Sequence, residues 1–268
     1  MGTNSIFESK ILTNEFERIF IIPKLSDKHH IIALPLTENF TLVGTAFDYL
    51  LRFHIKKINK KCTDGDWISL MVQGYSKYMG KSGKNVRQII KKAKKDYRIF
   101  LKEGISKEVC KSCLLLAKLD QIQRSGGDLP NDFEIDKKDI HDMINLYNTI
   151  PKDEFKSDVC ILNPTFGSAS LMIGGADADI IIGDTLIDIK TTKEMNFTKQ
   201  YFRQIVCYYI LNKIGGIDGL DKQIDIRKLG IYYSRYGVLF KFNIEDIVDK
   251  EELESFIKLF IDVAQGFE

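Results

Sequence analysis

Two short apolar runs that meet at a glycine-aspartate turn are the feature that most constrains the fold of this chain. Residues 174–190 read GGADADIIIGDTLIDIK, with Gly183 and Asp184 between the runs. We expect a β-hairpin in which Ile182 faces Thr185, because a two-residue turn of this kind fixes the register of the flanking strands. Apolar residues occur on both faces of the predicted strands, which indicates a hairpin that is buried on both sides.

The predicted register brings four charged side chains together. It pairs Asp179 with Asp188 and Asp177 with Lys190, and all four side chains project to one face. Three buried carboxylates and an amine are costly unless something compensates their charge, and Mg²⁺ prefers such oxygen ligands. Lys190 would hold or help to deprotonate an attacking water. An ordinary hairpin in which Asp188 and Lys190 neutralise one another remains the alternative.

A second pattern follows the hairpin. Residues 197–213 are expected to form a helix, and Gln204 and Tyr208 lie four apart on one of its faces. A D-x-K strand followed by a helix with Q-x-x-x-Y resembles the PD-(D/E)xK nuclease superfamily, in its RecB-like and lambda-exonuclease-like branch. The segment at 175–181 looks like the G-A-S-P-D segment of phage-type exonucleases. The resemblance makes Asp179 the metal-binding aspartate and leaves Asp177 as the second choice.

An upstream helix carries a third part of the resemblance. Residues 43–52 predict the start of an amphipathic helix, with apolar side chains at helical spacing. RecB-like nucleases have G-x-x-x-H or G-x-x-x-E at this place, and here Gly44 is followed by Asp48. Aspartate keeps an oxygen ligand for Mg²⁺ or Mn²⁺, although its reach is shorter. An exposed helix aspartate without a role is the alternative.

The resemblance implies a fold, a site and a mechanism. The fold class is α/β, with a restriction-endonuclease-like αβββαβ core, a central mixed sheet flanked by helices, and a helical insertion after the first core helix. The main-chain carbonyl of Ile189 joins Asp48, Asp179 and Asp188 as a metal ligand, and Lys190 positions the nucleophilic water. Gln204 and Tyr208 orient the catalytic groups or touch the phosphate backbone.

The element pattern predicts a single nuclease domain at 1–268, with a helical insertion at 65–150 and the catalytic sheet and Q-x-x-x-Y helix at 155–243. Expected strands are 18–23, 30–34, 158–162, 170–182, 185–191, 227–234 and 238–243. Expected helices are 44–60, 67–78, 84–102, 106–124, 137–147, 197–213 and 244–265, with a loop at 125–130.

Five scattered cysteines do not indicate a secreted disulfide framework. They are Cys62, Cys110, Cys113, Cys160 and Cys207. Cys110 and Cys113 lie in a predicted helix and are expected to pack in its core. Some RecB-like relatives bind an iron-sulfur cluster through four cysteines, three of them after the Q-x-x-x-Y helix. No cysteine follows Cys207, so no iron-sulfur cluster is expected.

Basic residues are concentrated on one predicted helix, although the formal net charge of the chain is only +2. They are Lys84, Arg87, Lys91, Lys92, Lys94, Lys95, Arg98 and Lys102. We expect them to surround the helix rather than form one stripe. Lys91 and Lys95 there, and Lys199 and Arg203 on the Q-x-x-x-Y helix, are candidate nucleic-acid contacts. A solvated lysine-rich surface is the alternative.

The sequence predicts a cytoplasmic, metal-dependent nuclease that hydrolyses phosphodiester bonds, with DNA as the expected substrate and repair, recombination or phage defence as the context. No apolar run is long enough for a membrane span, and no basic-then-apolar leader is found. A homo-oligomer is compatible with the sequence. Two alternatives stay open: a nucleic-acid-binding module that does not cleave alone, and a protein-interaction subunit that works with a helicase or ATPase partner, because this chain has no Walker A motif.

Overall fold

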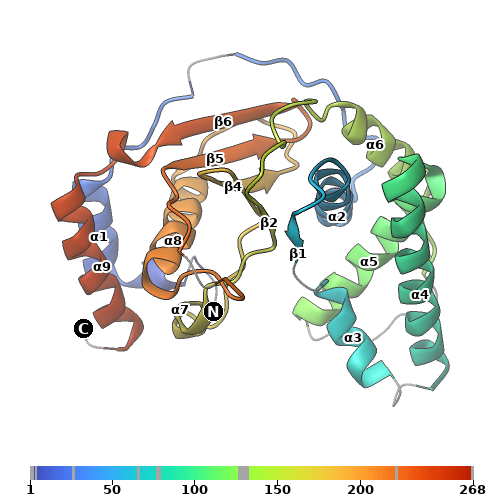
Figure 1. The fold of residues 1–268 in the computed structure, drawn as a ribbon, viewed down its shortest axis with the longest axis horizontal. Helices are drawn as coiled ribbons and strands as arrows, with labels where there is room; N and C mark the ends of the chain where they lie inside the picture. The colour runs from blue at the N-terminus through green and yellow to red at the C-terminus, as the bar shows by residue number, and fades with distance from the viewer. Residues whose placement is uncertain are drawn as a thin grey trace.

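A mixed β-sheet with helices on both sides forms the centre of the molecule (Figure 1). The computed structural model describes residues 3, 5–25, 28–64, 67–76, 80–125, 133–220 and 223–266. Within these residues the sheet has six strands, and their order in space follows their order in the chain. The strands are β1 (Thr63–Asp64), β2 (Cys160–Leu162), β3 (Ile180–Ile182), β4 (Thr185–Lys190), β5 (Lys228–Tyr233) and β6 (Val238–Asn243).

The strand pairing confirms the predicted hairpin. Ile182 lies opposite Thr185 in the antiparallel β3–β4 pair, and Gly183 adopts a positive φ of 60° in the turn, where glycine avoids strain. β1 pairs with β2 and β4 with β5 in parallel, whereas the other neighbours are antiparallel. A parallel pair needs a crossover connection, and α8 (Lys199–Gly215) joins β4 to β5.

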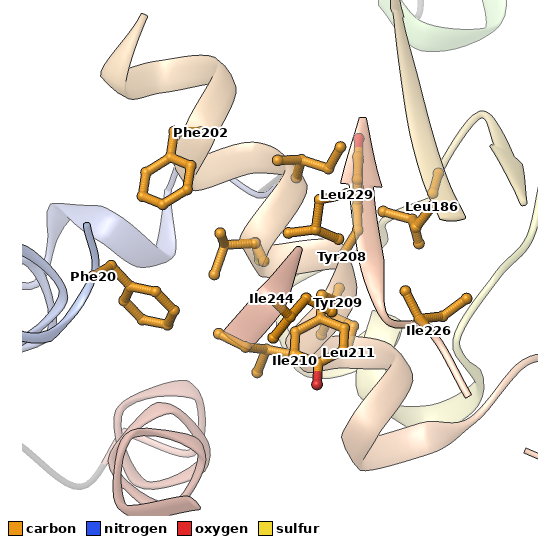
Figure 2. Packing of buried hydrophobic residues seen from close by; sticks show 14 of the residues in the cluster. Phe20, Leu186, Phe202, Tyr208, Tyr209, Ile210, Leu211, Ile226, Leu229 and Ile244 are labelled. Atoms are coloured by element: carbon orange, nitrogen blue, oxygen red, sulfur yellow. The ribbon is translucent and has the colours of Figure 1, made fainter. Parts of the chain in front are cut away.

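One face of the sheet packs against a helix that is buried nearly all round. Nine residues of α8 are buried, which is the pattern of a helix enclosed by its neighbours. Figure 2 shows Tyr208, Tyr209, Ile210 and Leu211 of α8 packed close to Leu186 and Leu229 of the sheet. The short 3-10 turn η1 (Ile6–Glu8) and the helices α1 (Lys10–Ile19), α7 (Gly167–Met172) and α9 (Lys250–Ala264) contribute to the same core.

The other face packs against a group of helices that begins with α2 (Phe40–Ile58) (Figure 1). Four helices follow it before β2, and they match the helices expected between residues 67 and 147. They are α3 (Ser69–Ser76), α4 (Gly80–Glu103), α5 (Lys107–Ser125) and α6 (Lys137–Asn148). Phe47, Leu50 and Leu51 of α2 are fully buried in this second core. The last two residues of the expected helix 67–78, and residues 126–130 of the expected loop, lie outside the described residues.

The strands expected at 18–23 and 30–34 were wrong. Residues 10–19 form α1, because Ser9 caps the helix by accepting from the Leu12 backbone amide, and Leu12 and Phe16 lie on its buried face. No strand occurs in the described part of residues 20–39. This segment instead attaches to the turn between β5 and β6 through amides of Ile32 and Ala33, which both donate to the Arg235 carbonyl.

Two further element boundaries differ from the prediction. The expected strand 170–182 is a strand only from Ile180, because Gly167–Met172 forms α7 and positive φ angles at Gly174 and Gly175 turn the chain afterwards. The expected helix 244–265 begins as the 3-10 turn η2 (Ile244–Asp246) and becomes α9 only after Asp249, whose side chain caps it. The two-residue β1 was not predicted.

A disulfide joins Cys62 to Cys160, a bond that the scattered cysteine pattern did not predict. The two residues precede or begin the parallel strands β1 and β2, so strand pairing brings residues 98 positions apart together. Cys110 and Cys113 are buried and free, as expected for packing cysteines, and Cys207 is also buried and free. Among the described residues, no helix has both the length and the apolar content needed to cross a membrane.

Candidate functional site

The carboxyl end of β4 is the point at which the predicted site residues meet. Asp188 and Lys190 lie there on one face of the strand, and α8 packs against the same strand. α2 approaches closely: a Cβ placed on Gly44 would lie 3.7 Å from the Thr191 Cβ. This is an ordinary van der Waals distance, so α2, which carries Asp48, packs against the end of β4 without a requirement for glycine at this position.

Asp179 lies beside Asp188, as the hairpin register predicts. Ile180 is opposite Ile187, so the next position along each strand places Asp179 across from Asp188. The Asp179 Oδ2 atom accepts a hydrogen bond of 2.6 Å from the Ile189 backbone amide. This bond fixes the carboxylate against β4 and uses one of its two oxygens.

Asp177 does not face Lys190, so this part of the prediction was wrong. β3 begins only at Ile180, and the chain before it bends toward Thr165, which forms an isolated bridge with Asp177. The Asp177 carboxylate instead lies 3.6 Å from Arg124 of α5. Asp177 therefore belongs to the rim of the site, in contact with the helices that follow α2.

A continuous chain of polar contacts runs from β4 to α8. Lys190 Nζ lies 2.7 Å from Asp188 Oδ2 and donates a 2.8 Å hydrogen bond to Gln204 Oε1. Gln204 Nε2 in turn donates to the Tyr208 hydroxyl at 3.0 Å. The structure thus brings together four of the predicted catalytic residues. Gln204 contacts the lysine directly, and Tyr208 contacts Gln204, so the Q-x-x-x-Y pair does more than pack in the core.

The Lys190 ammonium is held from a second side. Its Nζ lies 4.7 Å from the ring centre of Tyr201, which is the geometry of a cation-π interaction. Burial alone lowers the pKa of Lys190, but the adjacent Asp188 carboxylate outweighs it and raises the pKa above its usual value. The lysine is therefore a charged hydrogen-bond donor near neutral pH.

Asp48 reaches the site from α2 and is held by Arg52, one helical turn further on. Arg52 Nη2 lies 2.5 Å from Asp48 Oδ2, and the guanidinium also stacks 4.6 Å from the ring centre of Tyr49. Arg52 is buried, so its charge is weakly screened and acts on the nearby carboxylates of Asp48 and Asp179. The other oxygen of Asp48, Oδ1, is buried and has no hydrogen-bond partner within the described residues.

The three carboxylates are electrostatically unfavourable as a group. Burial raises the pKa of Asp179 well above its usual value, and the nearby Asp188 and Asp48 raise it further. Burial also raises the pKa of Asp188, against the opposing effect of Lys190, and the pKa of Asp48, against the opposing effect of Arg52. The pattern is that of acids whose charges lack sufficient compensation.

The donor chemistry of these carboxylates fits a hard divalent cation. Among the residues that the structure describes, Asp48 Oδ1 has no hydrogen-bond partner, and Asp188 Oδ2 has the Lys190 ion pair but no directed hydrogen bond. Oxygen atoms of this kind are the ligands that Mg²⁺ and Mn²⁺ prefer. Nevertheless, no three His, Cys, Asp or Glu side chains in the described parts of the chain are already arranged to hold a metal ion. Binding of a cation therefore requires small movements of the side chains.

Three other predicted site residues already make contacts within the chain. Ile189 uses its backbone amide to hold Asp179, and its carbonyl as a metal ligand stays a prediction. Lys199 and Arg203 of α8 are both paired with Glu17 of α1, at 3.4 and 2.8 Å, so any phosphate must compete with that carboxylate.

Three residues of the site were missed at the level of sequence. Arg52 could have been found, because a basic residue four positions after Asp48 on a helix is placed to pair with it. Tyr201 lies three positions before Gln204 on α8 and shares its side of the helix. Arg124 pairs with Asp120 four positions earlier on α5, which is a local signal, but its contact with Asp177 joins elements far apart in the sequence and could not be predicted.

A pocket of about 790 Å³ lies away from these residues, between α8, β5 and α9. Its lining includes Tyr209, Ile226 and Leu253 but none of the candidate catalytic side chains. The convergence of buried charged groups at β4 is the stronger candidate, because buried titratable clusters mark functional sites more specifically than an open surface groove. No known protein family, curated protein or solved structure matches this chain.

Proposed function

We propose that this protein is a metal-dependent nuclease that hydrolyses phosphodiester bonds, with DNA as its substrate class. The observation that carries the proposal is the connected set Asp188, Lys190, Gln204 and Tyr208, which joins β4 to α8 through direct contacts. If Asp188 and Lys190 formed only a structural ion pair, the lysine would not need its hydrogen bond to Gln204, and the pair would not need the carboxylates of Asp48 and Asp179 nearby.

The order of elements supports the proposal. α2, β2, β3, β4, α8 and β5 follow one another as in the αβββαβ restriction-endonuclease-like core of the PD-(D/E)xK nucleases. We propose that residues 1–268 act as one nuclease domain, with residues 65–150 as a helical insertion and residues 155–243 as its catalytic part.

Asp48, Asp179 and Asp188 are the side chains that would hold Mg²⁺ or Mn²⁺, and the Ile189 carbonyl is a further candidate ligand. A bound divalent cation supplies charge stabilisation for the phosphate and lowers the pKa of a bound water. The unpartnered Asp48 oxygen and the raised pKa values of the three acids support this assignment.

The residues of the chain then have distinct tasks in hydrolysis, in which a water oxygen forms a bond to phosphorus and the bond to the leaving oxygen breaks. Lys190, charged and held by Gln204, donates a hydrogen bond that orients the water or a phosphate oxygen. Tyr208 holds Gln204 in the rotamer that keeps this contact. The proton lost by the water passes to solvent, and the leaving oxygen gains one from solvent.

A nucleic-acid-binding module that does not cleave alone is the second candidate. The ion pair between Arg52 and Asp48 favours it, because one Asp48 oxygen is engaged and no complete group of ligands is preformed among the described residues. A partner such as a helicase or ATPase would then be needed for activity.

A cleavage assay distinguishes the two candidates. The purified chain is incubated with circular and linear, single- and double-stranded DNA, and with RNA, in Mn²⁺ and in EDTA. We expect cleavage that requires the metal and is lost in Asp188→Asn and Lys190→Met, and loss of circular substrates would establish endonucleolytic cutting. Asp184→Asn in the hairpin turn and Lys193→Met on the exposed loop are matched controls that should stay active. Binding without turnover in Mn²⁺ would refute the nuclease and leave the binding module.

A further inference from the structure

Helix α4 carries far more positive charge than the rest of the molecule. Residues 80–103 contain nine lysines and arginines and two acidic residues, whereas the whole chain has a net charge of only +2. The remainder of the protein is therefore net negative. A strong local excess of one charge in a nearly neutral protein indicates a surface for a ligand of opposite charge.

The basic side chains lie on one side of α4, which corrects the expectation that they surround the helix. Val86, Ile90, Ala93 and Phe100 are buried on the opposite side, against α2, α3 and α5. With 100° between successive residues, the positions at 84, 91, 95, 98 and 102 fall along a single stripe. The exposed basic residues of this α4 face are Lys84, Lys91, Lys92, Lys94, Lys95, Arg98 and Lys102.

The chain itself does little to neutralise the α4 face. Lys92 pairs with Asp96 at 2.6 Å, but the other six exposed basic residues form no ion pair with any described residue. Lys91 and Lys95 are four apart, as are Arg98 and Lys102, and like charges at this spacing destabilise a helix. The arrangement therefore lowers the stability of α4 when no counter-charge is bound.

The α4 face is separate from the candidate active site. α4 packs on α2, α3 and α5, and Figure 1 shows it at the outer edge of the molecule, beyond α2 and α5 from the sheet. Eighteen residues separate Lys84 from Lys102, which gives a charged stripe about 27 Å long at 1.5 Å per residue. A linear stripe of this length fits an extended polyanion better than a small anion.

We propose that the α4 face binds the phosphate backbone of a double-helical nucleic acid. This rests on nucleic acid as the proposed ligand class and adds a binding surface apart from the candidate active site, where binding needs neither a metal nor cleavage. A duplex presents a dense line of phosphates to a row of lysines. A single strand is usually held by exposed aromatic rings as well, and Tyr97 and Phe100 of α4 pack into the helical core instead.

A membrane surface fits the α4 face less well. Amphipathic helices that lie on lipid insert an apolar face between the headgroups. The apolar side of α4 is already used in packing, and the large exposed hydrophobic residues of the described chain include none from this helix.

The test is a duplex-binding titration in EDTA, in which no metal-dependent step occurs. Fluorescence anisotropy of a labelled DNA duplex longer than the α4 face is measured over a range of NaCl concentrations. The triple variant Lys91→Gln, Lys95→Gln, Arg98→Gln is compared with Lys10→Gln, Lys250→Gln, Lys258→Gln, which removes three exposed lysines at the other end of the molecule. We expect the α4 variant to bind at least about tenfold more weakly at low salt, with a salt-dependence slope smaller by about 3, and the control variant to bind as wild type.

Equal binding by the α4 variant and the wild type would overturn the proposal. So would α4-dependent binding to vesicles that contain phosphatidylserine in place of binding to duplex, or a preference for single strands. An RNA duplex in a parallel arm identifies which double helix is preferred. Asp188→Asn should bind the duplex in EDTA as the wild type does while losing cleavage in Mn²⁺, so failure of the nuclease proposal and failure of the α4 binding surface are distinguished.

Discussion

The Cys62–Cys160 disulfide should contribute a large part of the stability of this protein. It joins the two ends of the segment that contains α3 to α6, so it closes a loop across 98 positions of the chain. In the chain-entropy description, a cross-link around a loop of this size disfavours the unfolded state by about 4 to 5 kcal/mol. This is a substantial share of the roughly 5 to 15 kcal/mol by which typical domains are stable.

Urea unfolding of the oxidised protein, the reduced protein and Cys160→Ser measures this contribution. We expect the reduced protein and the variant to unfold together, at a lower urea concentration than the oxidised protein, with a free energy of unfolding smaller by about 4 kcal/mol. Added reductant should not destabilise Cys160→Ser further, which serves as the control for effects on other cysteines.

Thiol counting in the unfolded protein checks the bond itself. Three reactive thiols are expected without reductant, from Cys110, Cys113 and Cys207, and five after reduction. Five thiols before reduction, or coincident urea curves with and without reductant, would refute the reasoning. Because disulfides are rare in reducing compartments, a bond that persists in protein extracted under thiol-blocking conditions would also count against the predicted cytoplasmic location.

Three further predictions concern the site. Burial and the neighbouring carboxylates raise the pKa of Asp179 in the folded state, so the contribution of this group to the stability of the metal-free protein should be lost as pH rises through that pKa. Asp179→Asn should therefore raise the melting temperature in EDTA above that pKa and weaken this pH dependence. A lower melting temperature would contradict this reasoning. Arg52→Met leaves the Asp48 carboxylate without its partner and should lower the free energy of unfolding by about 3 kcal/mol in urea titrations. The double variant Arg52→Met, Asp48→Leu should recover part of this loss. No recovery in the double variant would argue against the ion pair as the cause. Tyr208→Phe keeps the ring but removes the hydroxyl that accepts a hydrogen bond from Gln204. In paired kinetic and melting measurements, the variant should lose more in the free energy of catalysis, calculated from kcat, than in the free energy of unfolding. Full activity would remove the Q-x-x-x-Y pair from the mechanism.

The sequence predicted the parts of the fold that depend on local signals. The hairpin register followed from the turn at Gly183 and Asp184, and the Asp188–Lys190 strand therefore came out in the correct place. The helices α2, α4, α5, α6 and α8 were found because apolar residues recur at helical spacing over many residues.

The misses have non-local causes. The Cys62–Cys160 bond and β1 depend on pairing between strands almost a hundred residues apart, which no local pattern records. Asp177 was misplaced because the chain bends away before β3, where the Ser170 hydroxyl donates to the Ala176 carbonyl and holds the turn. The basic residues of α4 were predicted correctly as a group, but their common face became clear only once the buried side of the helix was known.

A calorimetric titration with Mn²⁺ tests most directly whether the carboxylates around β4 form a metal site. The proteins compared are the wild type, the double variant Asp179→Asn, Asp188→Asn, and the control Asp184→Asn from the same hairpin. We expect saturable binding to the wild type and to the control, and loss of that binding in the double variant. Unchanged binding by the double variant, or no binding by a folded wild-type protein, would contradict the assignment of these residues as metal ligands.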